Sequence, residues 1–338
     1  MFTRKLGKSG IEVSAMGLGC MEIGGAMKND TERPPLEGSE PWEQPIFFLG
    51  DVDDNQSIRT IHHALDLGIN FFDTAPAYGA GHSEIILGHA LSDRRDQVVI
   101  ATKFGKFVDE EDNRFGRYQD EMEVIRNIRK ECEDSLGRLQ TDYIDLYQFH
   151  LPEFPPEPAV EILGILESLV SEGKICYYGW STNKPDCARI FVQGPHCTAI
   201  QHRLNPIQDA PEQLAICDEF DQASIARSIL ANGFLTGKYT VDNFRLLLLA
   251  NDTRQLADDS LIAARLGKLD MIRDILTSNG RTLAQGAISW VLARSPRTIP
   301  IPGFRTFTQV EENAMSMEFG PLNEEQMQEI DRILERKS

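Results

Sequence analysis

The stretch Ile144-Asp145-Leu146-Tyr147-Gln148-Phe149, followed by His150, shows the pattern that decides the fold. It is a short apolar run that ends on a polar side chain capable of chemistry. Four other runs along the chain end in the same way, on Asp73, Lys103, Ser181 and Gln201. A segment with helical periodicity follows each run, which predicts repeated strand–loop–helix units and therefore parallel strands with right-handed crossovers.

Eight strands of this kind are predicted, at residues 16–19, 69–72, 98–102, 144–149, 176–180, 198–200, 222–227 and 298–301. Helical spacing of apolar residues predicts helices near 55–67, 120–139, 158–172, 259–278, 282–293 and 323–336. Eight is the number of strands in a (β/α)8 TIM barrel, whose carboxyl strand ends meet around one mouth where the chemistry is placed. We therefore predict an α/β protein with this fold.

A doubly wound sheet is the alternative fold, but its dinucleotide signature is missing. The segment Gly17-Leu18-Gly19-Cys20-Met21-Glu22 begins like G-x-G-x-x-G and places Glu22 where the third glycine belongs.

The remaining segments fit a single barrel domain over residues 1–338. Residues 1–16 are predicted to form a β-hairpin around Gly7–Gly10, placed to close the bottom of the barrel. Residues 26–54 and 236–258 are longer than a connection needs and follow strands, so we expect long loops at the mouth, either lids or variable insertions.

The bulk properties restrict the partners. A net charge of −18 argues against nucleic acid or an anionic membrane. The six cysteines have no paired spacing, so neither a metal site nor a disulfide framework is expected. The N-terminus lacks a signal-like run and no apolar stretch reaches 18 residues, so we expect a cytoplasmic protein. The oligomeric state has no signal in the sequence.

Four of the polar groups suit the delivery of a proton to an oxygen that becomes an alkoxide: Asp73, Tyr78, Lys103 and His150. A tyrosine donates poorly at neutral pH unless its phenolate is stabilised. Lys103 at about 4 Å would contribute roughly 4 kcal/mol at an effective dielectric of about 20, on the order of three pKa units. Asp73 would keep that lysine charged, and His150 could hydrogen-bond the same substrate oxygen. Each residue taken singly is more often structural than functional, as a packed tyrosine, a surface-reaching lysine or a core histidine, whereas the set on successive strand ends indicates function.

These residues carry a family resemblance. Asp73–Gly79, Ala101–Gly105 and Tyr147–His150 resemble the Asp, Tyr, Lys, His tetrad of the aldo-keto reductases, and Leu6–Gly10, Ala64–Ala75 and Gly233–Tyr239 fit the same family. The resemblance runs from about residue 3 to 330. It implies a long-loop, NADPH-dependent barrel enzyme that reduces aldehydes or ketones by hydride transfer, with Tyr78 as general acid.

The resemblance also implies which residues bind NADP(H). Ser181 and Gln201 match the residues that hold the carboxamide, together with either Thr182 or Asn183. In Arg227-Ser228-Ile229-Leu230, Ile229 replaces the proline of many members, which implies a less rigid pyrophosphate loop. Arg305 is expected to bind the 2′-phosphate through two hydrogen bonds. Gln309 and Asn313 are suited to hydrogen-bonding the edge of the adenine. The other implied contacts are Gly19, Cys20, Met21, Asp73, Gly237, Lys238, Gly303 and Glu312.

Three functional classes remain. The first is an NADPH-dependent carbonyl reductase acting on a small molecule. The second is a cofactor-bound, redox-sensing regulatory subunit, as some relatives attached to ion channels are. A TIM-barrel hydrolase or isomerase of another family is the third, and it lacks a metal cluster or paired mouth carboxylates. An apolar pocket could be lined by Trp42, Phe47, Phe48, Phe107, Phe154 and Trp180, although packing explains them equally well.

Overall fold

The computed structural model describes residues 2–25, 28–29, 52–240, 242–243 and 259–336. Eight parallel strands form one sheet in the order β13-β12-β11-β10-β9-β6-β5-β3. Their bounds are β3 (Leu18–Gly19), β5 (Phe71–Asp73), β6 (Val99–Phe104), β9 (Ile144–Phe149), β10 (Ile175–Ser181), β11 (Cys197–Arg203), β12 (Ala223–Arg227) and β13 (Thr298–Pro300).

The two ends of this sheet meet, so the sheet closes into a barrel. Gly19 forms a parallel bridge with Gly303. The backbone N–H groups of Gly17 and Gly19 donate to the carbonyl oxygens of Pro300 and Pro302, each at 3.0 Å. The predicted (β/α)8 fold is therefore confirmed.

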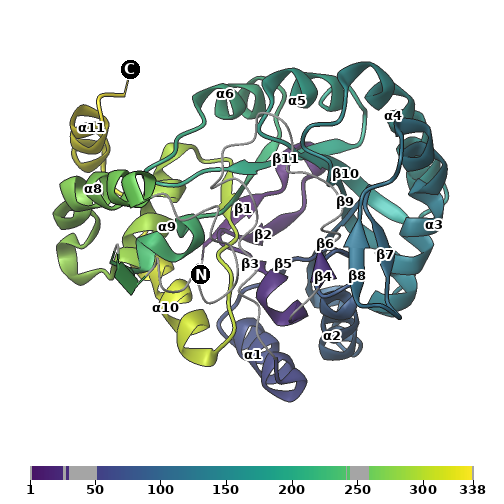
Figure 1. Cartoon of the computed structure of the whole chain (residues 1–338), viewed down its shortest axis with the longest axis horizontal. Helices are drawn as coiled ribbons and strands as arrows, with labels where there is room; N and C mark the ends of the chain where they lie inside the picture. The colour runs from purple at the N-terminus through teal and green to yellow at the C-terminus, as the bar shows by residue number, and fades with distance from the viewer. Residues whose placement is uncertain (1, 26–27, 30–51, 241, 244–258, 337–338) are drawn as a thin grey trace.

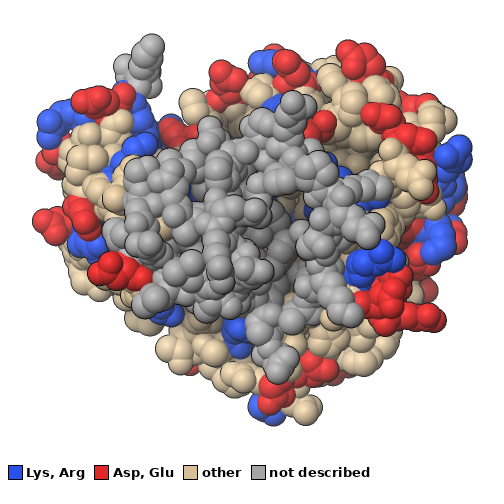
Figure 2. All heavy atoms as spheres, viewed as in Figure 1, with Lys and Arg blue, Asp and Glu red and all other residues tan. Residues whose placement is uncertain are grey.

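Helices surround the strands in a ring (Figure 1). They are α1 (Asp54–Asp66), α2 (His82–Leu91), α3 (Glu121–Leu139), α4 (Pro156–Ser171), α5 (Pro185–Phe191), α6 (Pro211–Glu219), α8 (Asp259–Leu276), α9 (Leu283–Arg294), α10 (Phe307–Phe319) and α11 (Glu324–Ile333). Aspartates start two of them because their carboxylates accept orphan N–H groups: Asp53 from Gln56 at 3.0 Å and Asp120 from Glu123 at 2.7 Å. Acidic and basic side chains are interspersed around the rim of the face in Figure 2.

The predicted N-terminal hairpin is present and closes one end of the barrel. Strands β1 (Thr3–Lys5) and β2 (Glu12–Ser14) pair antiparallel. Leu6 and Val13 are fully buried in one cluster with the inward-facing residues of the strands, which include Phe71 and Ile225. A β-carbon on Gly7 would meet backbone atoms at the start of β11 and β12, so the turn fits tightly against the amino ends of the strands.

A small second sheet was not predicted. It consists of β4 (Lys28–Asn29), β8 (Arg114–Gly116) and β7 (Phe107–Asp109), with β7 and β8 forming an antiparallel hairpin directly after β6. Because β6 ends at the mouth, this hairpin lies on the mouth side. The two predicted mouth loops, 26–54 and 236–258, lie mostly outside the described residues, and so do Trp42, Phe47 and Phe48. A single domain over 1–338 stays a prediction.

None of the described helices combines the length and the apolar composition that a membrane crossing requires.

Candidate active site

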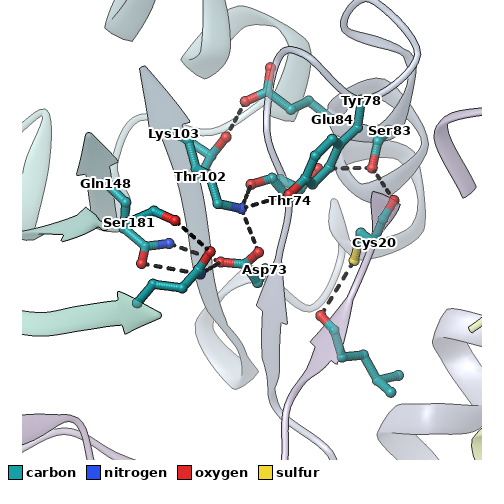
Figure 3. Close-up of polar contacts among 12 residues, drawn as sticks. Cys20, Asp73, Thr74, Tyr78, Ser83, Glu84, Thr102, Lys103, Gln148 and Ser181 are labelled. Atoms are coloured by element: carbon teal, nitrogen blue, oxygen red, sulfur yellow. Dashed lines mark hydrogen bonds and ion pairs between the residues drawn. The ribbon is translucent and has the colours of Figure 1, made fainter. Parts of the chain in front are cut away.

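The ammonium group of Lys103 lies at the centre of the site (Figure 3). It donates to Asp73 Oδ1 at 2.5 Å, to the carbonyl oxygen of Thr74 at 2.8 Å and to the hydroxyl oxygen of Tyr78 at 3.2 Å. The Lys103 side chain has no exposed surface and that of Asp73 is 2% exposed. Three of the four candidates are thus joined in one chain of hydrogen bonds, from the acid through the lysine to the phenol.

The second oxygen of Asp73 is held by two amides. Gln148 Nε2 donates to Asp73 Oδ2 at 2.8 Å and Gln201 Nε2 at 2.7 Å, while Ser181 Oγ donates to Gln201 Oε1 at 3.2 Å. Gln148 was missed as a site residue. The sequence did contain a signal for it. Gln148 lies on β9 two residues before His150, and side chains two residues apart point to the same face of a strand.

His150 completes the group without a hydrogen bond to the other three. Its ring lies edge-on to that of Tyr78, with centroids 6.1 Å apart. Burial lowers the pKa of His150 well below its usual value, and Lys106, Lys103 and Arg227 add to that shift. His150 is therefore a neutral hydrogen-bonding group at neutral pH.

The sequence led us to expect that Lys103 lowers the pKa of Tyr78, and the structure differs from this expectation in one respect. Burial raises the pKa of Tyr78, Lys103 offsets part of that rise, and the negative charge of Asp73 adds to it. Burial also acts against the charge on Lys103, but Asp73 and Tyr78 outweigh it and raise the pKa of Lys103. The phenol keeps its proton and the lysine its charge, which suits a proton donor beside a fixed positive charge.

The residues between β10 and α5 face different ways. Thr182 Oγ1 donates to the carbonyl oxygen of Pro152 at 2.9 Å and Thr182 is fully buried. Asn183 is exposed, and its Oδ1 accepts from the Arg203 N–H at 2.9 Å and from Arg227 Nη2 at 3.4 Å. Of the two, only Asn183 is exposed and carries a side-chain amide.

The loop after β12 carries the next group of candidates. Ser228 has a positive φ of 57°, which is uncommon for a residue with a side chain, and its carbonyl oxygen accepts from Asn205 Nδ2 at 3.1 Å. Leu230 precedes the 3-10 segment η5 (Ala231–Thr236), which ends at Gly237 with a φ of 74°. The backbone at Gly237 and Lys238 is exposed. The chain turns sharply here, and the N–H groups of Gly237 and Lys238 donate within the loop, to the Phe234 carbonyl oxygen at 3.4 Å and to Thr236 Oγ1 at 3.3 Å.

The loop after β13 lies beside the end of β3. Gly303 bridges Gly19, and the carboxyl group of Glu22 fills the space that a β-carbon on Gly303 would need. Cys20 is buried, and Met21 and Glu22 belong to the 3-10 turn η2 (Met21–Gly24). Burial raises the pKa of Glu22 to about 7, and Arg305 offsets part of that rise.

Two candidate cofactor-binding residues in α10 form hydrogen bonds with the backbone of the loop after β13. Gln309 Oε1 accepts from the Arg305 N–H at 2.7 Å and belongs to a capping box with Thr306. Asn313 is buried and its Nδ2 donates to the carbonyl oxygen of Gly303 at 3.4 Å, whereas Glu312 is half-buried. Both polar side chains stabilise the backbone that carries Arg305.

The described part of the chain contains no group of three or more His, Cys, Asp or Glu residues able to hold a metal ion. All six cysteines are free.

Comparisons with known proteins agree with this geometry. The profile of the aldo/keto reductase family matches residues 38–335. The NADH-specific methylglyoxal reductase of Escherichia coli (strain K12) is 31% identical over 343 residues, which cover 98% of this chain and 98% of that protein. The solved glycerol dehydrogenase from Gluconobacter oxydans is 31% identical with a TM-score of 0.76, and the match covers 99% of this chain and 95% of that one.

A second solved structure, an aldo-keto reductase from Klebsiella pneumoniae in complex with NADPH, has a TM-score of 0.68 at 23% identity, covering 99% of this chain and 96% of that one. At that identity the similarity concerns the fold alone. Fold and matches together define a barrel oxidoreductase that works with a nicotinamide cofactor. The chain belongs to the aldo-keto reductase family.

Proposed function

We propose that this protein is an NADPH-dependent reductase that converts an aldehyde or ketone group of a small molecule into an alcohol. The observation that carries the proposal is the buried Lys103, which bridges Asp73 and the hydroxyl group of Tyr78. A proton donor next to a fixed positive charge stabilises the negative charge that develops on a carbonyl oxygen during reduction.

The residues present fit a dinucleotide. Gly19 and Gly303 meet without β-carbons, Arg305 supplies a cation, and Lys238, which is exposed, supplies a second one. Arg227, Ser228, Leu230, Ser181, Gln201 and Asn183 would line the remaining path from the loop after β12 to the barrel centre. Glu22 must withdraw from Gly303 for a phosphate to approach there. When bound, NADPH would supply the hydride.

The protein's own groups divide the remaining work. Tyr78 and His150 are partly exposed, so both can reach a carbonyl oxygen at the mouth. His150, neutral and able to donate a hydrogen bond, would orient that oxygen, and Tyr78 would transfer its proton to it. Lys103 would then stabilise the phenolate, while Asp73, held by Gln148 and Gln201, fixes the lysine.

A Tyr78→Phe variant tests the proposal. We expect NADPH oxidation with a panel of aldehydes and ketones to fall by about 10²–10⁴-fold, the usual contribution of a positioned general acid. NADPH binding, followed by quenching of protein fluorescence, should stay within a few-fold of the parent. NADPH binding without turnover of any panel member by the parent protein would contradict the reductase and support a binding role.

A further inference from the structure

The hydroxyl group of Ser83 joins two chain segments beside the catalytic lysine and tyrosine (Figure 3). Ser83 is the second residue of α2 and has no exposed surface. Its Oγ donates to the carbonyl oxygen of Cys20 at 2.8 Å and lies 2.8 Å from Thr74 Oγ1. Because its single proton goes to the Cys20 carbonyl, the Thr74 hydroxyl is the donor in the second hydrogen bond. One side chain of α2 thus connects the residues that follow β3 and β5.

Through these bonds Ser83 reaches the Lys103–Tyr78 pair from both sides. Thr74, which the Ser83 hydroxyl holds, presents its carbonyl oxygen to the Lys103 ammonium at 2.8 Å. The N–H of Ser83 itself donates to the carbonyl oxygen of Tyr78 at 3.2 Å. Ser83 therefore supports a backbone group that binds the lysine and also the backbone of the proton donor.

The residue after Ser83 supports the strand that carries the lysine. Thr102, next to Lys103 on β6, donates to Glu84 in a short contact, and Glu84 has no exposed surface. Lys103 Nζ lies 3.2 Å from the hydroxyl oxygen of Tyr78. The first turn of α2 thus holds the backbone on either side of this short distance.

The loop between Tyr78 and α2 has a backbone that requires such support. Gly79, Ala80 and Gly81 have positive φ angles of 63°, 49° and 96° in succession, and Ala80 adopts this disfavoured region although it carries a β-carbon. A β-carbon on Gly79 would lie 1.9 Å from the carbonyl oxygen of Gly24, so the loop packs backbone against backbone on η2. Backbone of this kind persists only where the surrounding structure holds it. We therefore expect Tyr78 to shift when a buried hydrogen bond at the end of this loop is lost.

We propose that Ser83 is a positioning residue for the reduction, whose hydroxyl group keeps Tyr78 within hydrogen-bonding distance of Lys103 and thereby sets the rate of proton transfer to the carbonyl oxygen. This inference rests on the proposed function and adds a residue outside the four catalytic candidates. Ser83 has no exposed surface, so it touches neither the substrate nor the cofactor. Its hydroxyl should therefore affect the chemical step and not the binding of either molecule. A displacement of about 1 Å in a catalytic site can slow a reaction by about 10²-fold.

A Ser83→Ala variant tests the proposal in single turnovers. Protein loaded with NADPH is mixed with an aldehyde that the parent reduces, and the decay of NADPH absorbance gives the rate of the chemical step without product release. We expect this rate at saturating aldehyde to fall by about ten- to a hundredfold. The aldehyde concentration for half-saturation and the dissociation constant of NADPH should both stay within about threefold of the parent.

Ser14→Ala is the matched control. Ser14 is also buried, and its Oγ donates to the Met16 carbonyl oxygen at 2.7 Å and accepts from the Asn70 N–H at 3.1 Å. It therefore forms two hydrogen bonds between chain segments as Ser83 does, but at the amino ends of the strands. Both variants should lower the urea midpoint to a similar degree, whereas the single-turnover rate should fall only in Ser83→Ala.

Thr74→Val breaks the same link from its other side with little change of volume. It removes the hydroxyl that donates to Ser83 Oγ and keeps the backbone carbonyl that accepts from Lys103. Because the two variants share one hydrogen bond, the double variant Ser83→Ala/Thr74→Val should be about as slow as the slower single variant. Multiplied losses would show that the two hydroxyls act separately and would overturn the inference. Thr74→Val alone provides the test if Ser83→Ala does not fold.

The remaining outcomes separate this inference from the proposed function. Single-turnover rates within about twofold of the parent in Ser83→Ala and Thr74→Val would overturn the inference and leave the reductase standing. Equal losses of rate in Ser83→Ala and Ser14→Ala would also overturn it, because a general loss of stability would then explain both. A parent protein that reduces no aldehyde or ketone would instead contradict the proposed function itself.

Discussion

At the scale of single residues, Glu22 is the side chain that we expect to influence cofactor binding most unexpectedly. Its carboxyl group lies against Gly303, one of the residues expected to contact NADP(H) and the place where we propose that a phosphate approaches. The pKa of Glu22 is about 7, raised by burial, so the group is neutral below that pH and ionised above it. An ionised carboxylate repels a phosphate at the same place. Cofactor affinity should therefore weaken as the pH rises from 6 to 8.

We predict that Glu22→Gln removes this pH dependence. NADH is the better ligand for the measurement, because it lacks the 2′-phosphate that itself titrates near pH 6. Its dissociation constant, from fluorescence quenching, should rise several-fold between pH 6 and 8 in the parent and stay flat in the variant. Equal slopes for the two proteins would show that the Glu22 carboxyl leaves the phosphate path before binding.

Arg305 is the residue on which we expect the cofactor preference to depend. A guanidinium can bind a 2′-phosphate through two parallel hydrogen bonds, so Arg305→Ala should weaken NADPH by at least tenfold and NADH by less than threefold. The relative from Escherichia coli is NADH-specific, which makes the comparison informative. Equal weakening of both cofactors would assign Arg305 to the pyrophosphate or to loop structure instead.

At the scale of elements, the order and type of the barrel strands were predicted correctly, but the mouth ends of two strands were placed too early in the chain. Strand β6 was predicted at 98–102 and runs from Val99 to Phe104, and β11 was predicted at 198–200 and runs from Cys197 to Arg203. The apolar-run criterion stops at the first polar side chain. At the mouth of this barrel, Lys103 and Gln201 are buried and paired while still part of the ladder, so polarity there marks the site and not the strand end.

Helix α2 shows a different limit of sequence patterns. It was not assigned a range, because most of its residues are buried and no polar face remains to reveal the period. Gly88 allows this burial: a β-carbon there would lie 2.7 Å from the carbonyl oxygen of Arg138, so α2 packs directly on the backbone of α3. Such a contact depends on tertiary structure and leaves no local signal. The hydrogen bonds from Gln148 and Gln201 to Asp73 likewise join strands that are not neighbours in the sheet, so no local pattern reveals them.

An ion pair joins α2, α3 and β6 behind the site. Arg138 Nε donates to Glu84 Oε2 at 2.6 Å, Glu84 has no exposed surface, and Thr102 donates to its other oxygen in a short contact. Arg138→Met would leave the Glu84 carboxylate buried without its counter-ion. We predict a loss of about 3–5 kcal/mol in the free energy of unfolding, measured by urea titration. The double variant Glu84→Gln/Arg138→Met should lose clearly less, and equal losses would show that the pair contributes through packing alone.

The whole molecule separates stability from chemistry along the barrel axis. The hairpin β1–β2 seals the amino ends of the strands with Leu6 and Val13, whereas Tyr78, Lys103 and His150 lie at the carboxyl ends.

Because Leu6 is fully buried in the barrel core, Leu6→Ala should reduce the free energy of unfolding by about 2–5 kcal/mol through lost burial and a cavity. Its kcat/KM for a good aldehyde should change less than threefold at a temperature where the protein is folded. The exposed neighbour Lys5 provides the control, since Lys5→Ala should alter neither quantity. Tyr78→Phe should give the opposite result, with activity lost and the urea midpoint nearly unchanged. A Leu6→Ala protein that is fully folded but inactive would show that packing at the sealed end sets the geometry at the mouth, and the two ends of the barrel would then have to be treated as one coupled unit.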